Sequence, residues 1–120
     1  MAIDITCYTK LDHNLLQSKL DAIKSNYNYI FNHSYLIYTA NEVLTRQQLE
    51  LIVDPVEKYQ KESDLLISEE FGLKDARSYF MVSVNDKSFP EMNTSGMAEL
   101  LRKELGEKNI IVLLNGETLI

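Results

Sequence analysis

Cys7 and His13 are the residues in this sequence that could form a nucleophile and its base. A thiol attacks as the thiolate, which requires a nearby base or a positive field. Cys7, however, alternates with Ile3 and Ile5 in a stretch of strand periodicity, and so shares an apolar face with them. We therefore interpret Cys7 as an inert structural thiol and predict no catalytic residue.

The sequence also lacks the usual signatures of metal and cofactor sites. His13 and His33 do not have zinc-ligand spacing, and neither a P-loop nor a dinucleotide-binding fingerprint is present. The best small-ligand candidate is the helix start at Asn93, where Thr94, Ser95 and Gly96 offer amides and hydroxyls to an anion. An ordinary helix cap is the favoured interpretation, because no lysine lies in this loop. We predict neither a metal nor a cofactor.

Acidic residues are concentrated in the middle of the chain. Residues 41–75 hold nine Asp or Glu and four Lys or Arg, which accounts for most of the net charge of −6. Such a field repels nucleic acid and attracts a basic protein. The candidate partner-binding carboxylates are Glu57, Glu62, Asp64, Glu69 and Glu70. The alternative is a solvated helix face, because Glu57 and Lys61 have the i, i+4 spacing of surface ion pairs.

A second candidate contact surface is aromatic. The stretch from Tyr27 to Tyr38 is rich in tyrosine and asparagine, and tyrosine gives large contact area at low entropic cost. Tyr35 and Tyr38 are the expected anchors. Ring packing around a strand is the competing interpretation.

Hydrophobic periodicity predicts alternating strands and helices. Strands are expected at residues 3–8, 35–39, 79–84 and 110–114, with 79–84 central, and helices at about 10–25 and 94–105. Residues 41–54 fit a short helix started by Thr45 and Gln48, with a strand as the alternative. Asn115 and Gly116 predict a type I′ turn that leads into a short final strand.

Another helix is predicted to begin at Asp54 and Pro55, which have the chemistry of an N-cap and a first helical residue. Gly72 is expected just beyond its end. The helical spacing predicts that its buried face is formed by Val56, Tyr59, Ser63, Leu66, Ile67 and Phe71.

Together these elements predict one α/β domain over residues 1–120: a small layered sheet of about four to five strands with three to four helices and a C-terminal hairpin. A single cysteine rules out an internal disulfide. The start of the sequence does not resemble an export signal, and the longest apolar run, 110–114, is far too short for a membrane span. We expect a cytoplasmic protein that does not enter a membrane.

The first functional hypothesis is a non-catalytic protein-binding module, such as an inhibitor, immunity factor or chaperone, that meets a basic partner through its acidic surface. The second is a small enzyme or anion-ligand-binding domain with a site near residues 8–13 and 85–96, at the carboxyl ends of strands. The third is an assembly subunit that pairs through the edge of the C-terminal hairpin. The sequence does not indicate an oligomeric state.

Overall fold

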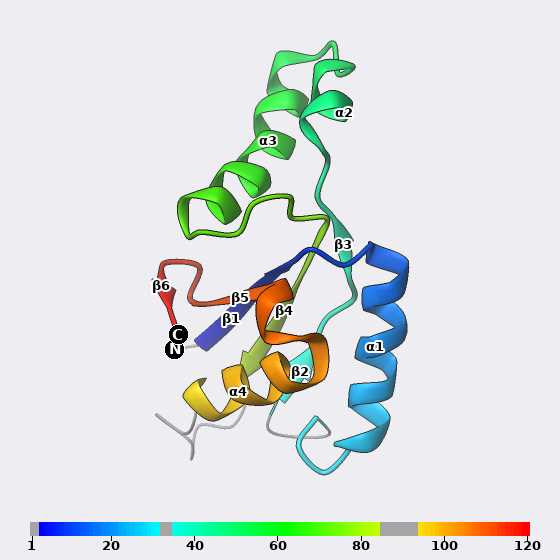
Figure 1. Cartoon of the computed structure of the whole chain (residues 1–120), viewed down its shortest axis with the longest axis vertical. Helices are drawn as coiled ribbons and strands as arrows, with labels where there is room; N and C mark the ends of the chain where they lie inside the picture. Colours follow the sequence, from blue (N-terminus) through cyan, green and yellow to red (C-terminus); the bar gives the residue numbers. More distant parts are fainter. Residues whose placement is uncertain (1–2, 32–34, 85–93) are drawn as a thin grey trace.

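The first strand of the chain lies inside the sheet rather than at its edge (Figure 1). The computed structural model describes residues 3–31, 35–84 and 94–120. Within them, β1 (Ile3–Thr9) pairs on one side with β4 (Ser78–Val84) and on the other with β5 (Ile110–Leu114). The strand order is β2-β4-β1-β5-β6, where β2 is Tyr35–Ile37 and β6 is Thr118–Leu119. A two-residue strand, β3 (Asn41–Glu42), also pairs with β4.

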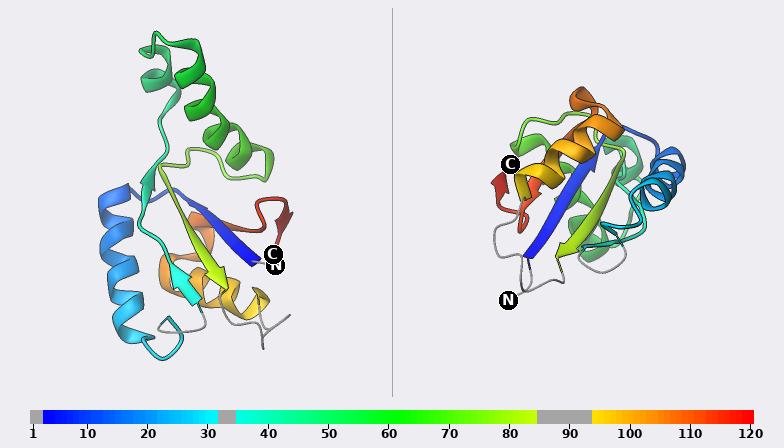
Figure 2. Two further views of the ribbon diagram at one scale, coloured as in Figure 1. Left: turned by 180° about the vertical axis from the view of Figure 1, so that it is seen from behind. Right: turned by 90° about the horizontal axis from the view of Figure 1, so that it is seen from below.

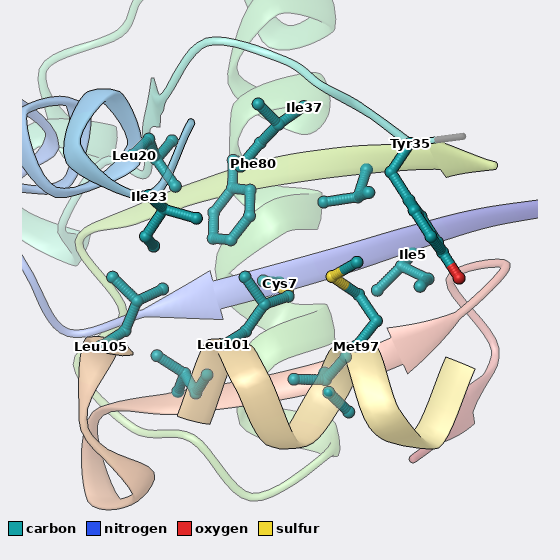
Figure 3. Packing of buried hydrophobic residues seen from close by; sticks show 14 of the residues in the cluster. Ile5, Cys7, Leu20, Ile23, Tyr35, Ile37, Phe80, Met97, Leu101 and Leu105 are labelled. Atoms are coloured by element: carbon teal, nitrogen blue, oxygen red, sulfur yellow. The ribbon is translucent and has the colours of Figure 1, made fainter. Parts of the chain in front are cut away.

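Two helices cover one face of the sheet. α1 (His13–Asn26) and α4 (Thr94–Leu105) pack against the side chains of β1 and β4 that point to this face (Figures 2 and 3). Cys7, Phe80 and Leu101 are completely buried in this layer. A 3-10 turn, η1 (Glu107–Asn109), then leads from α4 into β5. Strand alternation explains the arrangement, because every second residue of β1 faces these helices.

The opposite face carries a smaller apolar cluster beneath α2 (Arg46–Glu50) and α3 (Pro55–Glu70). Its buried members are Tyr8, Val43, Leu49, Leu65, Leu73, Ala76 and Leu113. This arrangement confirms the predicted fold class: a small α/β layered sheet with a C-terminal hairpin. The strands pair antiparallel throughout the described residues.

Local signals in the sequence placed most helix starts and turns correctly. Thr45 and Gln48 form a reciprocal capping box at the start of α2, and the Asp54 side chain accepts from Val56 N at the start of α3. Asn115 and Gly116 have φ of +52° and +71°, and Glu117 N donates to Leu114 O at 3.0 Å. Both central residues are thus left-handed, as a type I′ turn requires. α1 begins later than predicted, after the cap at Asp12.

The predicted buried face of α3 was wrong in its N-terminal half and also at Leu66 in its C-terminal half. Val56, Tyr59 and Leu66 are exposed, while Leu65 and Ser68 are buried. The reason is that α3 contacts the sheet only near its C-terminal end and extends away from it along the longest axis of the molecule (Figure 1). The radius of gyration of 14.6 Å exceeds the value of about 13.6 Å expected for a compact domain of this length.

Candidate functional site

A helical hairpin, residues 45–71, projects from the sheet and carries five of the seven predicted partner-binding residues. It consists of α2, α3 and the loop that joins them (Figure 1). Leu49 and Leu65 bury their side chains at its base. An ion pair links α2 to α3. The guanidinium nitrogen Nη2 of Arg46 donates to both carboxylate oxygens of Glu69, at 2.8 and 2.6 Å.

The five predicted carboxylates do not have equivalent surroundings. Glu57 and Glu70 are exposed and Glu62 is half-buried. Glu69 is paired with Arg46, which gives it a structural role in the hairpin. The two exposed glutamates therefore remain the best candidates for meeting a partner through charge.

Asp64 lies on the side of α3 that faces the sheet. Burial raises the pKa of its carboxyl, and Lys61 opposes that shift. On the sheet, burial and then Asp64 raise the pKa of Tyr8 to about 12, and the same two causes raise the pKa of Tyr79. Each shift has the sign expected when a carboxylate and phenols share a partly dehydrated space. Asp64 thus belongs to the contact between α3 and the sheet.

The two predicted tyrosine anchors lie on opposite faces of β2 and its extension. Tyr35 is buried, with 6% of its surface exposed, and packs edge-on against Phe31 with 6.4 Å between ring centroids. Tyr38 is 47% exposed, and its backbone N donates to Met81 O at 2.9 Å. Strand alternation puts Tyr38 on the face of the sheet that also carries the hairpin. Of the two, only Tyr38 is exposed to solvent.

Sequence reasoning missed the apolar tip of the hairpin, which we define as Leu51, Val53, Val56 and Tyr59. These side chains are 81%, 93%, 65% and 77% exposed. The loop contributes the first two, and the first turns of α3 contribute the other two. Helical periodicity predicted that Val56 and Tyr59 lie in the core. The sequence thus showed an apolar stripe at these positions, but the stripe faces solvent instead of the core.

The described ends of the two stretches of the second predicted site, residues 8–13 and 85–96, lie apart. Thr9 pairs with Ser78, whereas Val84, which precedes the second stretch, pairs with Ile3 at the other end of β1. The second stretch ends in the first turn of α4, close to Met97, which lies beside Ile5 (Figure 3). Because β1 and β4 are antiparallel, their carboxyl ends lie at opposite edges of the sheet and not at one edge, as they would in a parallel pair. Residues 85–93 lie outside the described residues.

Several residues in or beside these two stretches contribute to packing, hydrogen bonding or helix structure. Cys7 is fully buried, and burial raises the pKa of its thiol far above the ordinary value. Thr9 and Ser78 are buried and share a hydroxyl hydrogen bond of 2.5 Å. Thr94 is the first residue of α4, followed by Ser95 and Gly96 in its first turn. Asn93, which completes the anion-site motif, is not among the described residues.

Metal sites and membrane-spanning helices are absent from the described part of the chain. Across residues 3–31, 35–84 and 94–120, histidine, cysteine and carboxylate side chains do not gather in groups suited to holding a metal ion. None of the helices described is both long enough and apolar enough to cross a bilayer. The hairpin, which carries exposed acids and the apolar tip, is therefore the candidate functional site.

Comparison with known proteins agrees with a binding role. The family model described as CDI system immunity component matches residues 1–118. The immunity protein CdiI-2 of Burkholderia pseudomallei strain 1026b is 32% identical over 95 residues, which cover 77% of this chain and 73% of that protein. A chain of the solved CdiA-CT/CdiI toxin and immunity complex from Burkholderia pseudomallei is similar with a TM-score of 0.75 and 26% identity, covering 98% of this chain and 95% of that chain.

This chain therefore belongs to the CDI system immunity component family. Membership confirms the immunity role within the first functional hypothesis, while the basic partner and the acidic surface stay predictions.

Proposed function

We propose that this chain is an immunity protein that binds its cognate CdiA-CT toxin domain and inhibits it by direct contact. The family match and the similarity to a chain from a toxin and immunity complex support this function. The projecting hairpin is the observation that supports this choice of toxin-binding surface. It exposes Glu57 and Glu70 on an element that has few contacts with the rest of the fold.

The acidic hairpin acts first, during encounter. Clustered charge of one sign raises the association rate with a partner of the opposite sign, so the toxin surface that it meets is basic. Exposed charges at the rim of an interface mainly affect association, whereas buried anchors mainly affect dissociation. Tyr38 adds a ring on the same side of the sheet as the hairpin.

The test is the association kinetics of the purified chain with the cognate CdiA-CT toxin domain from the same organism. The double variant Glu57→Lys with Glu70→Lys should lower the association rate by about tenfold at low salt. Glu99→Lys with Glu117→Lys is the matched control, because these two glutamates are also exposed but lie outside the hairpin. Their reversal changes the net charge by the same amount and should have a much smaller effect.

Salt provides an independent measurement. The Debye length falls from about 10 Å at 0.1 M to about 3 Å at 1 M, so added salt should slow association of the wild-type protein. The hairpin variant should lose most of this salt dependence. Equal effects of the two double variants, or association that is indifferent to salt, would exclude the acidic hairpin as the steering surface. A wild-type protein that does not bind its cognate toxin would refute the function itself.

A further inference from the structure

We propose that the apolar tip of the hairpin, Leu51, Val53, Val56 and Tyr59, is the anchor that holds the toxin domain. It inserts into an apolar recess on the toxin whose border carries lysine or arginine. This inference rests on the proposed function and adds to it the site of tight contact, which the acidic residues do not supply.

The exposure of these four residues is the first observation. Single apolar side chains on a surface are ordinary, but here four large ones, 65% to 93% exposed, fall within residues 51–59. Apolar groups gathered on an exposed surface mark protein interaction sites, and tyrosine is enriched among the residues that dominate binding energy. Burying them on binding recovers hydrophobic free energy that folding leaves unused.

The tip is held in one conformation by its own hydrogen bonds. Leu51 N donates to Gln48 O at 3.2 Å, and Ile52 N donates to Leu49 O at 3.1 Å, so α2 ends in a closed turn. The Asp54 carboxylate accepts from Val56 N at 3.0 Å, and Pro55 fixes the first helical residue of α3. A preorganised surface loses little conformational entropy on binding. These bonds are what a rigid anchor requires.

The charges beside the tip identify its occupant. Glu50 precedes Leu51, Asp54 follows Val53, and Glu57 follows Val56, whereas Lys58 precedes Tyr59. Residues 50–59 thus carry three carboxylates and one ammonium group. The opposing surface therefore needs basic side chains around its apolar contact. A second copy of this chain does not meet that need, because it would bring the same carboxylates, on a chain of net charge −6, against this tip.

The test compares two tyrosines of nearly equal exposure. Tyr59 in the tip is 77% exposed, and Tyr29, after α1, is 73% exposed. Binding to the cognate CdiA-CT toxin domain is measured for Tyr59→Ala, Val53→Ala and Tyr29→Ala by titration calorimetry and by dissociation kinetics. Each tip variant should raise the Kd by about tenfold or more, mainly through faster dissociation. Tyr29→Ala should stay within about twofold of wild type.

Folding of the variants is checked in the same samples. Since Val53 and Tyr59 bury little surface, their melting temperatures should match that of the wild type, and weaker binding then reports a lost contact. Wild-type affinity in both tip variants would overturn the anchor while leaving the proposed function intact. Concentration-dependent dimers that Tyr59→Ala abolishes would also overturn it, since the occupant would then be a second copy. A wild-type protein that fails to bind the toxin refutes the proposed function and the anchor together.

Discussion

Two adjacent leucines on α3 give the sharpest test of how the hairpin is attached. Leu65 is 4% exposed and Leu66 is 46% exposed, although helical spacing had assigned Leu66 to the core. Leu→Ala removes three carbon groups, worth about 0.8 kcal/mol each when fully buried, or about 2.4 kcal/mol in all. The cavity left at Leu65 brings the expected cost to about 3–4 kcal/mol. At Leu66, where about half of that burial is present and a cavity does not form, the cost should be about 1 kcal/mol.

These energies convert into distinct melting temperatures. An unfolding entropy of about 2.1 cal/mol/K per residue gives a shift of about 4 °C per kcal/mol for a chain of this length. Leu65→Ala should therefore melt about 12–16 °C below wild type, and Leu66→Ala about 4 °C below, by circular dichroism. Amide exchange in α3 should accelerate in the Leu65→Ala protein, because this side chain fixes the helix to the sheet. Equal losses from the two variants, or a larger one from Leu66→Ala, would refute this account of the attachment.

Three further predictions concern single residues. Gly116→Val should lower the free energy of unfolding by about 1–2 kcal/mol. Since φ is +71° and an added Cβ meets nothing within 4 Å, the penalty is purely conformational. Gly116→Asn should melt close to wild type, and equal melting of both variants would contradict the turn. Cys7→Ala should cost roughly 1–2 kcal/mol through lost packing without affecting toxin binding, and rapid labelling of the native thiol would contradict its burial. The raised pKa of Asp64 means that its charge opposes folding once the pH exceeds the ordinary value of 3.8. Asp64→Asn should therefore melt higher than wild type at neutral pH and near it at pH about 3, whereas a lower melting temperature at neutral pH would show that the charge is stabilising.

Features set by short-range chemistry could be predicted from the sequence. The caps at Thr45 and Asp54 and the turn at Asn115 and Gly116 each depend on neighbouring backbone groups, and all three are present. The alternation of Ile3, Ile5 and Cys7 also identified the buried face of β1. These predictions succeeded because the interactions lie within a few residues of one another in the chain.

Features that depend on distant parts of the chain could not be predicted. Helical periodicity shows that α3 has an apolar face, but a stripe that faces solvent for a partner has the same spacing as one that faces a core. Val56 and Tyr59 illustrate this ambiguity. Strand direction was equally hidden, because buried strands have the same sequence pattern in parallel and antiparallel sheets. The sequence therefore did not show that the carboxyl ends of β1 and β4 lie apart. For Tyr35 and Tyr38, the tyrosine content alone did not say which ring would be buried.

The position of β1 in the sheet determines when the sheet can assemble during synthesis of the protein. β1 is synthesised before both of its hydrogen-bonded neighbours: Thr9 is 69 residues from Ser78, and Ile110 follows later still. At ordinary elongation rates, about 5–20 s pass between synthesis of β1 and synthesis of β5. Until then the apolar face of β1 has no sheet to join on that side, so the central sheet assembles only after β5 has been synthesised.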